Sequence, residues 1–105
     1  MIQLTEETKS GWWVVGVRGR ADAEAAEALE GALRAALDAH PRVAADLAHL
    51  DYISSAGLRA VIQAARAAQA KNLEFAVCSL SASVRKVFDM SGMHHILQIH
   101  GELPC

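Results

Sequence analysis

The stretch DLAHLDYISSAGLRAVI (Asp46–Ile62) decides the fold, because it joins a compact apolar run to a strongly periodic segment. The run from Arg42 to Leu50 has a short, nearly continuous apolar core, which is typical of a strand buried on both faces. From Ser55 to Ala70, apolar residues recur at helical spacing. These apolar positions are Leu58, Val61, Ile62, Ala65 and Ala68. The stretch therefore predicts a strand and a helix, with the paired serines Ser54 and Ser55 at their junction.

The same patterns extend outward to both ends of the chain. Two β-rich segments, Ile2–Thr8 and Trp12–Gly19, are separated by a short turn and should form an antiparallel hairpin. A helical pattern then fills Arg20–His40, with Asp22 as its expected N-cap, and Pro41 ends it. Beyond Ala70 we expect a strand within residues 72–80, a short helix within 81–92 and a last short strand within 95–100.

The predicted order is therefore ββαβαβαβ. Strand–helix–strand units imply parallel pairing, and the first hairpin adds an antiparallel element. With 105 residues, the chain is expected to form one domain, residues 1–105. We predict an α/β fold in which a small mixed sheet packs against α-helices.

The composition excludes several classes of protein. A formal net charge of −2 lacks the basic field of a nucleic-acid binder. The polar, acidic N-terminus MIQLTEETK does not resemble a signal peptide, and no window approaches the ~20 apolar residues of a membrane span. Two cysteines, Cys78 and Cys105, are expected to be reduced thiols. We therefore expect a soluble, cytoplasmic protein that does not bind nucleic acid or insert directly into a membrane.

Ser54 and Ser55 are the candidate functional residues, because function in an open α/β sheet gathers beyond the carboxyl ends of the strands. Serine is a favoured N-cap, worth about 1 kcal/mol over alanine, but capping explains one serine and not the pair. A catalytic serine on a G-x-S-x-G elbow would need glycine where Tyr52 and Ile53 stand. A phosphorylated aspartate at Asp46 would need further carboxylates around a magnesium ion, and the sequence pattern does not supply them.

Phosphorylation of a serine is the remaining alternative. A phosphate at a helix N-terminus meets unpaired backbone N–H groups and the positive end of the helix dipole. Close to two added negative charges would then leave the helix intact while changing the sign of the surface. Because like-charge contacts in an interface cost several kcal/mol, such a phosphate would switch a partner off.

The stretch also resembles the signature of the STAS family of anti-sigma-factor antagonists, D-L-S-x-[apolar]-x-x-[apolar]-D-S-[ST/A]-G-L. Asp46 and Leu47 fall on its opening Asp-Leu, and the pair Gly57-Leu58 falls on its Gly-Leu. Ser55 falls on the serine that a partner kinase phosphorylates in the family. Ser54 occupies the position where relatives usually carry an aspartate.

Two further segments are similar to the family. GRAD (Gly19–Asp22) resembles its G-x-L-D loop, whose aspartate lies on the kinase-facing surface. The segment SVRKVFDMSGMHHILQI, residues 83–99, resembles the usual C-terminal ending. The resemblance therefore covers the whole chain in motif, element order and length.

The resemblance implies a partner-switching protein that is not an enzyme and has no cofactor. When unphosphorylated, it would bind an anti-sigma factor, often a GHKL-type serine kinase. Phosphorylation of Ser55, or alternatively of Ser54, would release this partner, and a PP2C-type phosphatase would reset the switch. The partner-binding residues are expected to be Asp22, Ser54, Ser55, Gly57, Leu58 and Arg59. The alternative is a non-phosphorylated STAS subunit of an ABC-type lipid transporter or another complex.

Other conspicuous residues have simpler interpretations. Arg59 falls on the exposed side of its helix, either as a solvated charge or as part of a partner-binding ridge beside Ser55. Three histidines, His94, His95 and His100, have no carboxylate or thiol beside them at ligand spacing, so no metal site is expected. The adjacent Trp12 and Trp13 should point to opposite faces of the sheet.

Overall fold

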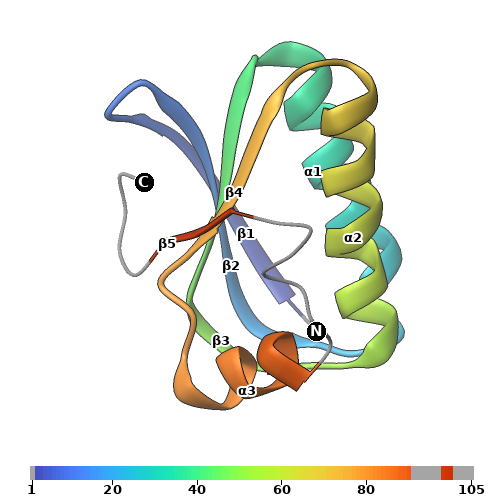
Figure 1. Ribbon diagram of the computed structural model, residues 1–105. Coiled ribbons are helices and arrows are strands. Elements are labelled where there is room, and N and C mark those ends of the chain that lie inside the picture. Colours follow the sequence, from blue (N-terminus) through green and yellow to red (C-terminus); the bar gives the residue numbers. More distant parts are fainter. Residues whose placement is uncertain (1, 91–97, 101–105) are drawn as a thin grey trace.

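The computed structural model describes residues 2–90 and 98–100, with side chains described for residues 2–90 (Figure 1). The elements are β1 (Ile2–Lys9), β2 (Trp12–Ala21), α1 (Ala26–Ala39), β3 (Arg42–Ile53), α2 (Ser55–Ala70), β4 (Glu74–Cys78), α3 (Ala82–Met90) and β5 (Gln98–His100). The five strands form one sheet in the order β1-β2-β3-β4-β5. The predicted α/β class and the order ββαβαβαβ are confirmed.

β1 and β2 form the predicted antiparallel hairpin. Their pairing runs from Ile2 opposite Gly19 to Lys9 opposite Trp12, which leaves a two-residue loop. The loop residues Ser10 and Gly11 have φ angles of 54° and 85°. Positive φ at both positions is the geometry of hairpin turns whose twist matches that of the strands.

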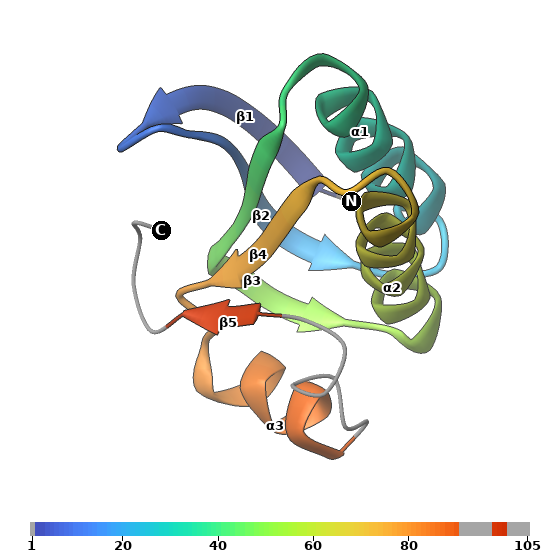
Figure 2. The same ribbon diagram turned by 45° about the horizontal axis from the view of Figure 1, so that its top comes forward.

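The other neighbouring strands are parallel, and α1 and α2 lie side by side on one face of the sheet (Figures 1 and 2). The apolar stripes of both helices pack on the inward side chains of β2 and β3 in one core. α3 lies beyond the carboxyl end of β3, where the Ser81 hydroxyl just before α3 donates a 3.0 Å hydrogen bond to the carbonyl oxygen of Leu50. The arrangement brings the starts of α1 and α2 to one end of the molecule (Figure 1).

β3 is buried on both faces, as its apolar run predicts. Val43, Ala44 and Ala45 have no exposed surface, because β2 and β4 flank them and apolar side chains pack on both faces of the strand. Alternate residues belong to two separate apolar clusters, one on each side of the sheet. The cluster opposite α1 and α2 consists of Trp12, Val14, Ala44, Ala76 and Cys78.

Several boundaries differ from the prediction. β2 continues to Ala21 instead of ending at Gly19, so Arg20 and Ala21 belong to a strand and not to the predicted helical segment. β3 continues to Ile53 instead of ending at Leu50, because β2 pairs with its polar end through Arg20 opposite Tyr52 and Ala21 opposite Ile53. The predicted role of Asp22 as the N-cap of the helix is wrong. α1 starts at Ala26 with Ala25 as its N-cap, and no side chain caps it. Asp22 caps the preceding turn instead.

The tryptophans lie on opposite faces, as predicted. Trp12 is buried in the second cluster, with the guanidinium carbon of Arg42 4.5 Å from the centre of its ring. Trp13 is half-buried on the helix side, stacks on His40 with ring centroids 4.1 Å apart, and donates a hydrogen bond to Glu6. Both rings therefore cover apolar surface.

Cys78 is disulfide-bonded, so the expectation of a reduced thiol is wrong for this residue. The atom it bonds to lies outside the described residues. Cys105, His94 and His95 also lie outside them, and His100 is the last residue of β5.

Candidate partner-binding site at the start of helix α2

The two serines at the junction have different environments. Ser54 is the N-cap of α2, and its hydroxyl accepts a 3.1 Å hydrogen bond from the backbone N–H of Gly57. The same hydroxyl donates a 2.9 Å hydrogen bond to the carbonyl oxygen of Ala21, which also accepts the backbone N–H of Ser54 at 2.9 Å. The half-buried Ser54 side chain therefore uses both its donor and an acceptor site inside the protein.

Ser55 is the first residue of α2 and is exposed. Its hydroxyl makes no hydrogen bond within the part of the chain that the structure describes. A residue at this position projects from the positive end of the helix dipole, where backbone N–H groups lack intrahelical partners. Ser55 is therefore the serine that is accessible from solution.

Gly57 allows α2 to approach the end of β2 closely. A Cβ atom at this position would lie 2.7 Å from the carbonyl oxygen of Ala21 and 3.0 Å from Cγ1 of Ile53. Leu58, which follows it, is 8% exposed and belongs to the core. Gly57 and Leu58 therefore hold the start of α2 in place, while Ser55 and Arg59 provide its exposed surface.

Asp22 reaches the same end of the molecule because it directly follows Ala21. Its carboxylate accepts a 3.0 Å hydrogen bond from the backbone N–H of Ala25. This hydrogen bond, together with the nearby charge of Arg20, lowers the pKa of Asp22 below its ordinary value. The Asp22 loop is thus fixed as an anionic turn, and the shared carbonyl of Ala21 links it to Ser54.

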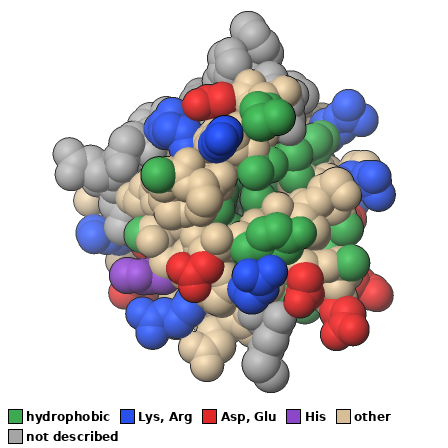
Figure 3. Space-filling view, turned by 90° about the horizontal axis from the view of Figure 1, so that it is seen from below, with side chains coloured by type: hydrophobic (Ala, Val, Ile, Leu, Met, Phe, Trp, Pro, Cys, Tyr) green, Lys and Arg blue, Asp and Glu red, His purple; other side chains and the backbone are tan. Residues whose placement is uncertain are grey.

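The surface around these residues carries both signs of charge. Arg20 lies over the ring of Tyr52, with 4.3 Å from its guanidinium carbon to the ring centroid, and the tyrosine is 40% exposed. Figure 3 shows this end of the molecule, with acidic and basic side chains around a band of hydrophobic ones. Tyr52, and Met90 of α3 at 80% exposure, are large apolar side chains that remain open to solvent.

Arg59 lies on one side of a groove between α1 and α2. The groove has a volume of about 380 Å³ and is lined by Ala26, Glu27, Glu30, Gly31, Arg34, Ala56, Arg59 and Ala60. Small side chains form much of its lining, and charged ones come from both helices. Ala56 and Arg59, which line the groove from α2, lie one and four residues after Ser55 in the sequence.

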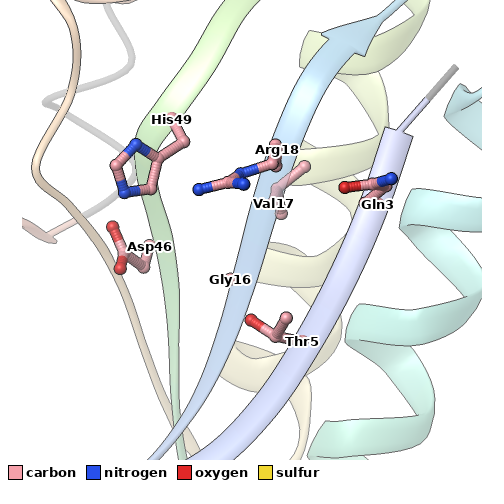
Figure 4. A pocket seen from close by; sticks show the side chains of 7 residues that line it. All are labelled: Gln3, Thr5, Gly16, Val17, Arg18, Asp46 and His49. Carbon is pink, nitrogen blue, oxygen red and sulfur yellow. The ribbon is translucent and has the colours of Figure 1, made fainter.

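A second hollow lies on the face of the sheet opposite α1 and α2 (Figure 4). It has a volume of about 250 Å³ and is lined by Gln3, Thr5, Gly16, Val17, Arg18, Asp46 and His49. The Asp46 carboxylate accepts a 3.0 Å hydrogen bond from the backbone N–H of Ala48. Sequence reasoning missed this hollow, and a glycine inside the β-rich run of β2 was the one local signal for it.

Within residues 2–90, no histidine forms a hydrogen bond with either serine. His49 lines the hollow on the sheet and forms no hydrogen bond with Ser54 or Ser55. Over the described ranges, no three or more His, Cys, Asp and Glu side chains are grouped to hold a metal ion. None of the described helices has the length and apolar character that crossing a membrane requires.

Comparison with known proteins places this geometry in a family. Residues 4–99 match the family model described as "Mlab, STAS domain". The chain is 37% identical over 99 residues to a candidate anti-sigma factor antagonist, BtrV, of Bordetella bronchiseptica, and the match covers 93% of this chain and 85% of that protein.

Solved structures agree with this match. An anti-sigma factor antagonist from Mycobacterium paratuberculosis superposes with a TM-score of 0.80 at 27% identity, covering 99% of this chain and 89% of that one. The phosphorylated form of the Bacillus cell fate determinant SpoIIAA shares the fold, with a TM-score of 0.71 at 22% identity over 97% of this chain and 93% of that one. The chain therefore belongs to the STAS domain family and resembles its anti-sigma factor antagonists.

Proposed function

We propose that this protein is the phosphorylation-controlled member of a partner switch. In its unphosphorylated form it binds an anti-sigma factor that is also a GHKL-type serine kinase. Phosphorylation of Ser55 releases this partner, and a PP2C-type phosphatase restores binding. The protein acts by binding in the cytoplasm, without an enzymatic activity of its own.

The observation that supports this proposal most strongly is the contrast between the two serines. The Ser54 hydroxyl is held between Gly57 and Ala21 and would have to break both hydrogen bonds to reach a kinase. The Ser55 hydroxyl is exposed and makes no hydrogen bond to a described residue. SpoIIAA, which shares the fold, has been solved in both an unphosphorylated and a phosphorylated form. We therefore assign phosphorylation to Ser55.

The proposed partner-binding surface combines Asp22, Ser55 and Arg59, supported from below by Ser54, Gly57 and Leu58. The exposed residues come from the end of β2 and the first turns of α2. A phosphate at Ser55 would add close to two negative charges to a surface that already carries Asp22. A partner matched to the unmodified surface would then be repelled, at a cost of several kcal/mol.

The experiment has two parts. Incubation with the cognate kinase and ATP, followed by peptide mass spectrometry, should place the phosphate on Ser55. In calorimetric binding assays with the kinase, Ser55→Ala should bind like the native protein, whereas Ser55→Glu should bind at least about tenfold more weakly. Gln69→Glu is a matched control, because it adds the same charge to an exposed position at the other end of α2.

Two outcomes would contradict the proposal. Phosphate on neither serine, with co-purification of an ABC-type ATPase, would favour the alternative function as a subunit of a lipid transporter. Equal affinity of the Ser55→Ala and Ser55→Glu proteins for the kinase would place the interface elsewhere.

A further inference from the structure

Arg59 stands four residues after Ser55 on the same face of α2. Side chains at this spacing have Cβ atoms about 5–6 Å apart, and long helical side chains lean toward the helix N-terminus. The Arg59 guanidinium can therefore reach the turn that carries Ser55. Arg59 is exposed and forms no ion pair with any described residue.

The charges around the groove make Arg59 distinctive. On the α1 side, Glu30 forms an ion pair with Arg34 at 3.5 Å, so that pair is balanced within its own helix, and Glu27 adds one further acidic side chain to the lining. Arg59 is the one charged residue that α2 contributes to the described lining; the others are Ala56 and Ala60. An arginine fork binds carboxylate and phosphate groups in the same bidentate manner. Arg59 is thus placed to take either an acid of a docked partner or a phosphate on its own helix.

We propose that Arg59 reads the state of Ser55: it binds a carboxylate of the partner while Ser55 is unmodified, and it pairs with the phosphate once Ser55 is phosphorylated. This inference rests on the proposed function of Ser55. Phosphorylation then changes the surface twice, because it adds negative charge at residue 55 and withdraws a cation from the groove. The switch requires no rearrangement of the backbone.

The pair can be tested without a partner. Phosphoserine is installed at position 55 by genetic encoding, and its second ionisation, with a pKa of about 6, is followed by phosphorus NMR. Arg59 should stabilise the dianion, so the pKa should be a few tenths of a unit lower in the native chain than in Arg59→Gln. Arg66→Gln is the control. Residue 66 lies about 16 Å along α2 from residue 55, which exceeds the Debye length of about 8 Å, so its charge should have little effect on the phosphate. Superimposable titrations of the native and Arg59→Gln proteins would overturn the proposal.

A binding cycle with the kinase tests the second half of the proposal. Arg59→Gln should weaken binding of the unphosphorylated protein severalfold, and phosphorylation should then reduce affinity by a smaller factor than it does in the native chain. If the effects of Arg59→Gln and of phosphorylation on Kd simply multiply, Arg59 does not respond to the state of Ser55, and the proposal is wrong. That failure differs from failure of the proposed function, in which phosphoserine at position 55 would leave the affinity for the kinase unchanged in every variant.

Discussion

The hydroxyl of Ser54 donates a 2.9 Å hydrogen bond to the carbonyl of Ala21, which lies 33 residues earlier in the chain. The same oxygen receives the Ser54 backbone N–H, so one acceptor joins the end of β2 to the start of α2. An aspartate at position 54 could still accept the N–H of Gly57, but an ionised carboxylate could not donate to Ala21. The serine that departs from the family pattern thus supplies a contact that the usual residue cannot make.

Replacing Ser54 with alanine should destabilise the protein by about 1–2 kcal/mol, because α2 loses its side-chain cap and Ala21 loses a half-buried donor. Urea unfolding followed by circular dichroism measures the effect. Ser55→Ala is the matched control and should change the free energy of unfolding by less than about 0.5 kcal/mol, since its hydroxyl makes no described hydrogen bond. Equal losses for the two variants would contradict the assignment of the cap.

Two helical glycines should respond in opposite directions to alanine. In Gly57→Ala, the new Cβ would meet the Ala21 carbonyl at 2.7 Å, so overpacking should cost about 1–3 kcal/mol. In Gly31→Ala, nothing lies within 4 Å of the new Cβ, and the better helix propensity should add up to about 1 kcal/mol. Thermal melts should show a decrease in Tm for the first variant and an increase of about 4–8 °C for the second. A decrease for both would mean that Gly31 has a packing role within the fold.

A negative charge at residue 55 should leave the fold intact. Ser55→Glu places a carboxylate in the first turn of α2, where the helix dipole favours it by about 0.3–1 kcal/mol. Ala70→Glu, at the last residue of the same helix, is the opposing control and should be destabilising by a similar amount. Circular dichroism spectra and thermal melts of both variants provide the measurement. A loss of helix in Ser55→Glu would contradict the proposal that phosphorylation changes only the surface of the protein.

The stability contribution of Asp22 should depend on pH. Its pKa is lowered in the folded protein, chiefly by the hydrogen bond from the backbone N–H of Ala25. A lowered carboxyl pKa contributes stability above the pKa of the unfolded chain, and this contribution is lost as the pH falls below about 4. Asp22→Asn should therefore reduce stability at pH 7 but not at pH 2–3, and an equal loss of stability at both pH values would contradict the assigned role of its carboxylate. Urea unfolding at a series of pH values gives the comparison.

The fold could be predicted because the spacing of apolar residues in each segment matches the helix or strand that the segment forms. Helical spacing after Ser55 and the apolar run before Leu50 gave two central elements, and α2 has the predicted bounds Ser55–Ala70. The end of β3 was missed because Asp51 and Tyr52 are polar and exposed, and their strand conformation comes from pairing with β2. Such pairing is a long-range effect that the local sequence does not encode.

The candidate site could be located from sequence, and the motif already favoured Ser55 over Ser54 as the phosphorylated residue. The sequence could not show how the Ser54 hydroxyl is held, because one of its two partners, the carbonyl of Ala21, lies 33 residues earlier in the chain. The groove beside Arg59 was likewise out of reach, because its lining comes from two helices that meet only in the folded chain. Sequence periodicity indicates which face of a helix is apolar, but it does not show how closely a neighbouring helix packs against it.

The shared acceptor at Ala21 has a consequence for how an enzyme would recognise Ser55. The start of α2, which carries the exposed serine, is held by hydrogen bonds to Ala21 at the end of β2. A peptide covering Asp46–Ile62 would contain the motif but would lack Ala21. A short helix of this kind is marginal in water on its own. An enzyme that modifies Ser55 would therefore recognise a folded shape and not a linear motif, and the unfolded chain would be a poor substrate.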